Sequence, residues 1–480
     1  MTQIGESEFV VTSYCHSCQH WRHAQSDRPQ WPCLENTIMS PAKPAARPLP
    51  PEPPRRDRRF MATRQDDRIL CLPLETVTPI FGGAASPRQL DDVDAIRVSG
   101  IRGQLRFFWR ALYGHECQNA AELAAQEFAL WGGITAQQPV RSRVDLWLSH
   151  VSGIGPGSRD TSRIKDRRVG YVLWPARPPR EEAPWAPRRK KGVQFCLHVR
   201  IADPDRKAGN GSEITNATQV LSALRAWLLF GGIGSRTRRG CGSLTINLTA
   251  CAGQPDRIQL AAWLPAEANP MAIERLLGMR CISKPARPLR DMPSLHGARL
   301  FHGRPGRSPK KAWEQAISWL QQFRMEIGPK QRGKPKRELN HARAIQERAA
   351  LGLPIVGLAG NENARLGWNN RAGQSRDRLT SPVIFKPLPL ADGRFAPIAL
   401  WLARADPKGS LIWLCGDSPQ GLVAGEFPKS DRLLGDFKSK FSRLKESTSS
   451  GENSRRKGSN KPRNGGNSPR NRRQGGKRRQ

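Results

Sequence analysis

Several features that mark common classes of protein are missing from this chain of 480 residues. No apolar run approaches the length of a membrane-spanning helix, and no signal peptide opens the sequence. The ten cysteines are scattered, which provides no disulfide framework in a chain of this length. We therefore expect a cytoplasmic protein without membrane contact, in which Cys196, Cys241 and Cys281 are buried free thiols.

Signals for a catalytic centre are also sparse. The sequence has three tyrosines, and its close group of carboxylates, Asp91, Asp92 and Asp94, lies in a loop-like stretch where solvated acids are the usual case. Metal-dependent cleavage of a phosphodiester requires clustered carboxylates. We therefore expect no cofactor, and we expect that the protein is not an enzyme.

One group of residues has the composition of a zinc site. Cys15, Cys18, His20 and Cys33 are ligand types that zinc accepts. A second knuckle, which would complete the pattern, is missing. These residues are weak zinc candidates, and we expect no metal.

Acidic residues are few compared with basic ones. The chain has 79 Lys and Arg against 41 Asp and Glu, which gives a net charge of +38. Counterion release favours the binding of such a basic surface to a phosphate backbone. A nucleic acid is the expected partner. An anionic membrane surface is the competing one, and the lack of a long apolar run argues against it.

The most informative stretch, residues 216–248, has the pattern of a helix, a glycine-rich loop and a strand. Apolar residues repeat at helical spacing after Asn216, a suitable N-cap, and Leu244, Ile246 and Leu248 alternate as in a strand. The loop between them carries glycines, which allow close approach of a ligand, and arginines, which match phosphate geometry. Phosphate binding and an ordinary exposed loop are both open. The loop lacks the Gly-Lys-Ser/Thr ending of a Walker motif.

Residues 96–114 predict a second helix with two stripes. Ile101, Leu105, Phe108, Trp109 and Leu112 form an apolar stripe that belongs in the core. Beside it, basic residues recur every four positions, at Arg102, Arg106 and Arg110. The basic stripe is either a solvated face or part of a binding surface.

Alternating segments at residues 69–81, 144–151 and 193–201 complete an order of strand, helix, strand, strand, helix, strand, which is typical of the ferredoxin-like fold. The predicted fold class is therefore α+β, with two ferredoxin-like (RRM-like) domains in tandem, long insertions and disordered tails. Residues 1–60 form an N-terminal extension with a proline-rich linker, and translation starting at Met61 is an alternative hypothesis. The first domain spans 61–251, the second and degenerate one 252–440, and a disordered basic tail 441–480.

Several of these segments together resemble a known family. LETVTPIFGG, IRVSGIRGQLRFFWRALYG, RSRV and FGGIGSRTRRGCGSL are similar to the RAMP superfamily of CRISPR proteins, and within it to the subunit numbered one of the type III-B Cmr effector complex. LGLPIVG and RLTSPVIFKPLPL extend the resemblance, which covers roughly residues 69–415. The cysteine-bearing N-terminal extension and the basic C-terminal tail depart from the family pattern.

The resemblance implies a non-catalytic, RNA-binding role in antiviral defence. Such a subunit contacts guide RNA and target RNA at the 3′ guide end, beside other subunits of the Cmr effector complex. The residues implied to bind RNA are Arg97, Arg102, Arg106, Arg141, Arg143, Gly232, Gly234, Ser235, Arg236, Arg238 and Arg239.

Two other functions compete with this one. A metal-independent endoribonuclease that processes guide RNA would use a histidine as its acid or base, and the candidates are His115, His150 and His198. A basic protein associated with the ribosome would fit the charge but not the set of motifs.

Overall fold

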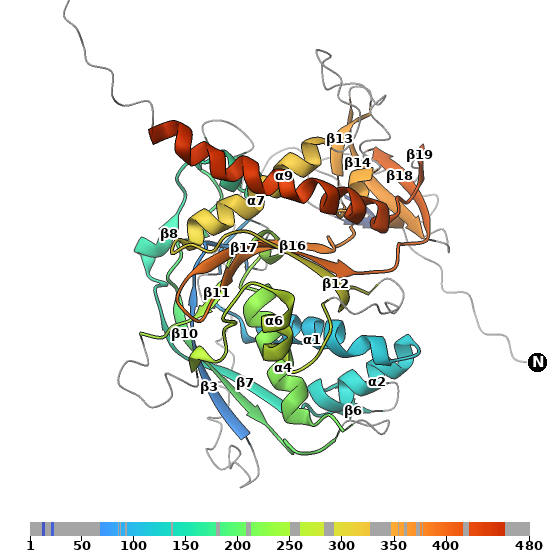
Figure 1. Ribbon diagram of the computed structural model, residues 1–480. Helices are drawn as coiled ribbons and strands as arrows, with labels where there is room; N and C mark the ends of the chain where they lie inside the picture. The colour runs from blue at the N-terminus through green and yellow to red at the C-terminus, as the bar shows by residue number, and fades with distance from the viewer. Residues whose placement is uncertain are drawn as a thin grey trace, which may run out of the picture. The chain divides into compact units, whose positions relative to one another are not determined.

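The computed structural model (Figure 1) describes residues 12–14, 21–23, 68–84, 86, 88–91, 94–135, 138–178, 183–207, 213–249, 260–282, 292–326, 347–353, 355–359, 362–370, 375–376, 378–415 and 422–456. The chain divides into two units, Met1–Ala62 and Thr63–Gln480. In the first unit, β1 (Thr12–Tyr14) and β2 (Trp21–His23) pair in antiparallel orientation. The weak zinc candidates Cys15, Cys18, His20 and Cys33 lie outside the described residues.

The second unit begins with a four-stranded antiparallel sheet. Its strands are β3 (Arg68–Thr76), β7 (Val144–Ser152), β10 (Gln194–Ile201) and β11 (Leu244–Ile246), in the order β11-β3-β10-β7. Every second residue of β10 is buried, so the sheet has one apolar face. The helices α1 (Val98–Tyr113) and α4 (Asn216–Phe230) pack against that face. The elements follow the predicted order of strand, helix, strand, strand, helix, strand.

The start of α4 differs from the prediction by one residue. Thr215, not Asn216, is the N-cap, because its hydroxyl accepts a hydrogen bond from the backbone N–H of Thr218 at 3.2 Å. The side-chain amide of Asn216 instead donates to the carbonyl oxygen of Asp203 at 3.0 Å.

A second antiparallel sheet forms the middle layer of this unit (Figure 1). It contains β12 (Ser294–His302), β16 (Val383–Pro389) and β17 (Phe395–Ala403), in the order β12-β17-β16. One face, which includes Ile384 and Ile398, shares a core with α1 and α4. The opposite face, which includes Phe385, packs against α7 (Pro309–Glu326) and α9 (Ser430–Arg456). The fold is therefore α+β, as the sequence predicted.

The second unit contains a further sheet and several shorter elements. A third antiparallel sheet has the order β13-β14-β18-β19, with β15 paired to β14. Its strands are β13 (Ile355–Ala359), β14 (Glu362–Asn370), β15 (Ser375–Arg376), β18 (Gly409–Cys415) and β19 (Leu422–Glu426). The other helices and short strands are β4 (Ile80–Phe81), α2 (Ala120–Trp131), β5 (Gly133–Ile134), β6 (Pro139–Val140), β8 (Arg159–Asp160), α3 (Arg167–Val172), β9 (Arg188–Arg189) and α6 (Pro270–Leu277).

Two details of the second unit bear on the sequence predictions. Helix α9 continues to Arg456, so helical structure extends past residue 441, where the basic tail was predicted to begin. No helix among the described residues is long and apolar enough to span a bilayer.

The predicted burial of the cysteines is right at two of three positions. Cys241 and Cys281 are buried free thiols, and burial raises the pKa of each to about 12. Cys196 is only partly buried, because the alternation of β10 turns it away from the core that Phe195 and Leu197 enter.

Candidate nucleic-acid interface

The glycine-rich loop between α4 and β11 is held by backbone hydrogen bonds to the segment around β4. The N–H of Ser235 donates to the carbonyl oxygen of Phe81 at 2.7 Å, and the N–H of Gly242 donates to that of Pro79 at 2.9 Å. Gly234, Gly240 and Gly242 all have positive φ, which glycine adopts at little cost. The loop therefore has a defined shape rather than a flexible one.

The tip of the loop is its exposed part. Gly234, Ser235 and Arg236 are exposed, whereas Gly232 is buried. Although the side chain of Arg236 reaches the surface, the surrounding chain removes water from it and lowers its pKa, and the charge of Arg324 lowers it further. The positive charges of Arg236 and Arg324 therefore act on each other, and an anion near the tip of the loop would reduce this repulsion.

Arg238 and Arg239 are turned towards the second half of the chain. Both are partly buried, in the short helical turn η5 (Thr237–Arg239). The guanidinium of Arg238 donates to the carbonyl oxygen of Ser381. That of Arg239 donates to the carbonyl oxygens of Val383 at 3.0 Å and Leu351 at 3.4 Å. These side chains bind the loop to β16 and its neighbours.

The same turn makes further contacts that fix both arginines. The indole N–H of Trp313 donates to the carbonyl oxygen of Arg239 at 2.7 Å. The guanidinium of Arg238 lies 4.7 Å from the ring centre of Phe107. Burial lowers the pKa of Arg238 to about 10 and that of Arg239 to about 9, so both stay charged at neutral pH. Contact of these two arginines with RNA stays a prediction.

The predicted basic stripe of α1 is bonded to the protein itself. The guanidinium of Arg102 donates to the carbonyl oxygen of Val144 at 2.9 Å. Arg106 and Arg110 donate to the same carboxylate oxygen of Glu127, at 2.5 and 2.6 Å. Glu127 is buried, so its charge requires such partners. These contacts hold α2 and β7 against α1.

The other predicted arginines divide into paired and unpaired ones. Arg97 forms an ion pair with Asp91, and Arg143 forms one with Asp203. Arg141 is exposed and has no ion pair within the part of the chain that the structure describes. Of the predicted arginines, Arg141 and Arg236 therefore offer the freest charges to a ligand.

A buried lysine on β16 contacts the first glycine of the loop, and the sequence did not predict this role. Lys386 on β16 is 0% exposed, and its ammonium donates to the carbonyl oxygen of Gly231 at 2.8 Å. Burial lowers its pKa to about 7. The feature of the sequence that indicates a buried lysine is its position inside the otherwise apolar segment VIFKPLPL.

The pKa of Lys386 predicts how stability changes with pH. The unfolded chain keeps this proton up to a pKa of ~10.4, whereas the folded chain releases it near pH 7, so unfolding takes up a proton between these values. Raising the pH in this window therefore stabilises the folded state, and lowering it through pH 7 removes the gain. The free energy of unfolding of the wild type minus that of Lys386→Met should rise by about 2 kcal/mol from pH 7.5 to 9. Urea unfolding at both pH values measures it, and parallel pH profiles would contradict it.

Two of the three candidate histidines lie near each other. His198 on β10 is within 2.6 Å of the hydroxyl of Ser149, and its ring stacks on Trp147 with ring centres 5.1 Å apart. Partial burial lowers the pKa of His198, and the neighbouring His150 lowers it further. A neutral imidazole beside a hydroxyl is able to accept a proton.

The remaining candidates for chemistry lie elsewhere. His115 stacks on His296, with ring centres 3.4 Å apart. Asp91 is paired with Arg97, and Asp92 lies outside the described residues. Within the described ranges, no group of three or more side chains is arranged to hold a metal ion.

The segment that contains these features recurs in a known family. Residues 73–245 match the RAMP superfamily model. The match confirms the resemblance that the motifs indicated. It starts in β3 and ends in β11, so the RAMP segment includes α1, α4 and the whole glycine loop.

Solved structures are similar to more of the chain than the RAMP segment. The apo form of Cmr1 from Pyrococcus furiosus is 14% identical, with a TM-score of 0.40 over 77% of this chain and 96% of that one. Type III-B Cmr-beta bound to cognate target RNA and AMPPnP is 11% identical, with a TM-score of 0.43 over 79% and 99%. Type III-B Cmr-beta bound to cognate target RNA is 12% identical, with a TM-score of 0.39 over 70% and 96%. The comparison with curated proteins finds no match.

Proposed function

We propose that the chain is a non-catalytic, cytoplasmic RNA-binding subunit of a type III-B CRISPR effector complex, which contacts guide RNA and target RNA at the 3′ guide end beside other Cmr subunits. The observation that carries the proposal is the exposed tip of the glycine loop, Gly234 to Arg236, within the segment that matches the RAMP superfamily. A rigid loop with an arginine at its tip suits a phosphate backbone, and it reads no sequence. The net charge of +38 supports the same partner.

The fold proposed for this function is a pair of ferredoxin-like domains. The first sheet, in the order β11-β3-β10-β7, has the strand order of that fold, 4-1-3-2. In the second half, the series β12, α7, β16, β17, α9 and the sheet order β12-β17-β16 fit the same fold without its last strand. The sheet of β13, β14, β18 and β19 is an insertion in this second domain.

The proposal is tested by RNA binding over a range of salt concentrations. Replacing Arg236 with alanine should weaken binding to a labelled guide RNA. It should also reduce the slope of log affinity against log salt by about 0.7, the value for one phosphate contact on a single strand. The control is Arg432→Ala on α9, which removes an equal charge from a side chain that is 68% exposed. Equal slopes for wild type and Arg236→Ala would contradict the proposal.

A metal-independent endoribonuclease is the second candidate, favoured by the contact between His198 and Ser149. The same RNA, incubated with a chelator, distinguishes the two functions. Intact RNA supports the non-catalytic role. Cleavage at a defined site that survives chelation and disappears in His198→Ala would replace it.

A further inference from the structure

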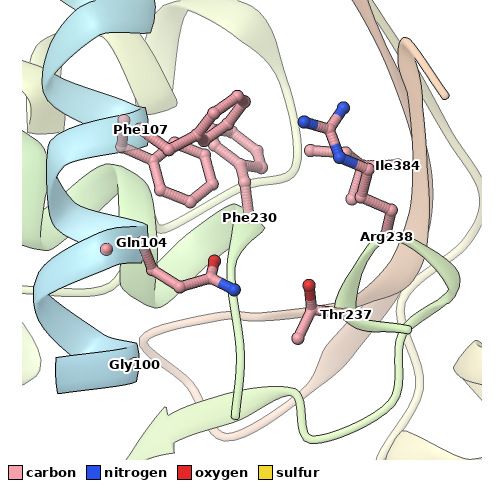
Figure 2. Close-up of a pocket in the computed structure, with 9 residues that line it drawn as sticks. Gly100, Gln104, Phe107, Phe230, Thr237, Arg238 and Ile384 are labelled. Atoms are coloured by element: carbon pink, nitrogen blue, oxygen red, sulfur yellow. The ribbon is translucent and has the colours of Figure 1, made fainter. Parts of the chain in front are cut away.

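A cavity of about 300 Å³ lies between α1 and the glycine loop (Figure 2). Gly100, Gly103, Gln104 and Phe107 of α1 form one side, and Thr237 and Arg238 of η5 form part of the other. The end of α4 and β16 complete the lining, through Phe230 and Ile384. The volume is at the lower end of the range for small-molecule sites, which leaves room for one flat ring system.

The two glycines of α1 keep this space open. A Cβ on Gly103 would have no neighbour within 4 Å, and one on Gly100 would meet only the Cβ of Arg97 at 4.0 Å. Packing within the described chain therefore does not require glycine at either position. Glycine also weakens a helix relative to alanine. Two glycines on one face suit a ligand that approaches the helix backbone closely.

Polar groups of two kinds face the same space. Figure 2 shows the amide of Gln104 and the hydroxyl of Thr237 on opposite sides of this space. Neither side chain has a hydrogen-bond partner among the residues that the structure describes. An amide both donates and accepts, and a hydroxyl does the same, as the edge of a nucleobase requires.

The part of the cavity beside Phe107 and Arg238 offers a surface for stacking. The ring of Phe107 is partly exposed, and the guanidinium of Arg238 lies over it at 4.7 Å. The bond from Arg238 to the carbonyl oxygen of Ser381 keeps this guanidinium in place. Unpaired bases of RNA stack on aromatic rings and on arginine planes.

We propose that this cavity binds one unpaired nucleobase of an RNA strand that crosses the glycine loop. The proposal rests on the proposed RNA-binding function and adds a site to it. Arg236 at the exposed tip holds the backbone, and the base beside it turns inward between Gly103 and Thr237. Amide and hydroxyl groups contact the edge of the base, and the guanidinium of Arg238, which Phe107 covers on its other side, contacts the face of the base.

The test combines variants of the full chain with RNA that lacks one base at a time. An abasic nucleotide at one position should weaken binding to the wild type about tenfold, as expected for the loss of one stacked base. Gly103→Leu, which fills the cavity, should lower the affinity for intact RNA to a similar extent and should be insensitive to the abasic position. Gly435→Leu is the matched control, because Gly435 also lies in a helix with no neighbour within 4 Å. It should leave affinity unchanged.

Two further measurements keep the outcomes distinct. Thermal unfolding checks that Gly103→Leu folds. If that variant does not fold, Gln104→Ala replaces it, because Gln104 has no internal hydrogen bond to lose. Gln104→Ala should reduce the loss of affinity that the abasic nucleotide causes. If RNA binds the wild type but the variants at residues 103 and 104 do not change the effect of any abasic nucleotide, the nucleobase site is contradicted and the proposed function is not. RNA that does not bind the wild type overturns both.

Discussion

Replacing Gly242 with alanine is expected to lower the free energy of unfolding by about 4 kcal/mol, the sum of backbone strain and a steric clash. Gly242 has a φ of 59°, in the left-handed region. A Cβ there would lie 2.0 Å from the carbonyl oxygen of Ile233, which is backbone and cannot turn aside. The N–H of Ile233 also donates to the carbonyl oxygen of Gly242 at 2.9 Å, so any relief of the clash breaks this bond.

The control for this prediction is Gly278→Ala. Gly278, at the end of α6, has a similar φ of 74°, but a Cβ there would have no neighbour within 4 Å. Alanine should therefore cost only the strain of the left-handed conformation, about 1 kcal/mol. Urea unfolding of the full chain measures both variants. Equal losses would show that the clash at Gly242 is relieved and that the loop is softer than its contacts indicate.

Replacing Arg239 with alanine is expected to cost about 3 kcal/mol of unfolding free energy, because hydrogen bonds from a charged donor disappear and acceptors on buried residues remain. The guanidinium of Arg239 donates to the carbonyl oxygens of Val383 and Leu351, and both would lose this partner. The aromatic ring of Phe385, 5.8 Å from the guanidinium, would lose its contact as well.

Arg236→Ala is the matched control, since it removes the same side chain three residues away. Arg236 is exposed, so its loss should change the free energy of unfolding by less than about 0.5 kcal/mol. The two variants should therefore separate stability from RNA affinity. If Arg239→Ala is as stable as the wild type and binds RNA weakly, Arg239 is a ligand contact and not an internal one.

The sequence was sufficient for the elements of the first sheet and its helices. Residues such as Phe195 and Leu197 alternate because β10 has one covered face, and the stripe that includes Leu105 and Trp109 repeats because α1 has one. Both patterns depend on local geometry alone. The position of the glycine loop followed from the same elements.

The roles of the arginines were less accessible. Arg102 and Arg239 bond to carbonyl oxygens that lie 42 and 144 residues away, and backbone carbonyls leave no trace in a sequence. The burial of Lys386 was not predicted for a different reason. Alternation places a lysine on the solvent side of a strand, but every residue of β16 is buried, because both faces of its sheet are covered.

That double covering also limits how the molecule moves. A hinge between the two halves would have to pull Ile384 and Ile398 out of one core while Arg238 and Arg239 release the other side of β16. Hinge motions are favoured where few apolar contacts join the two moving parts. Here, many apolar contacts join the two halves. The loop and the cavity beside it are therefore preorganised. Association with the proposed RNA ligand should be limited by diffusion and electrostatic steering rather than by a conformational step.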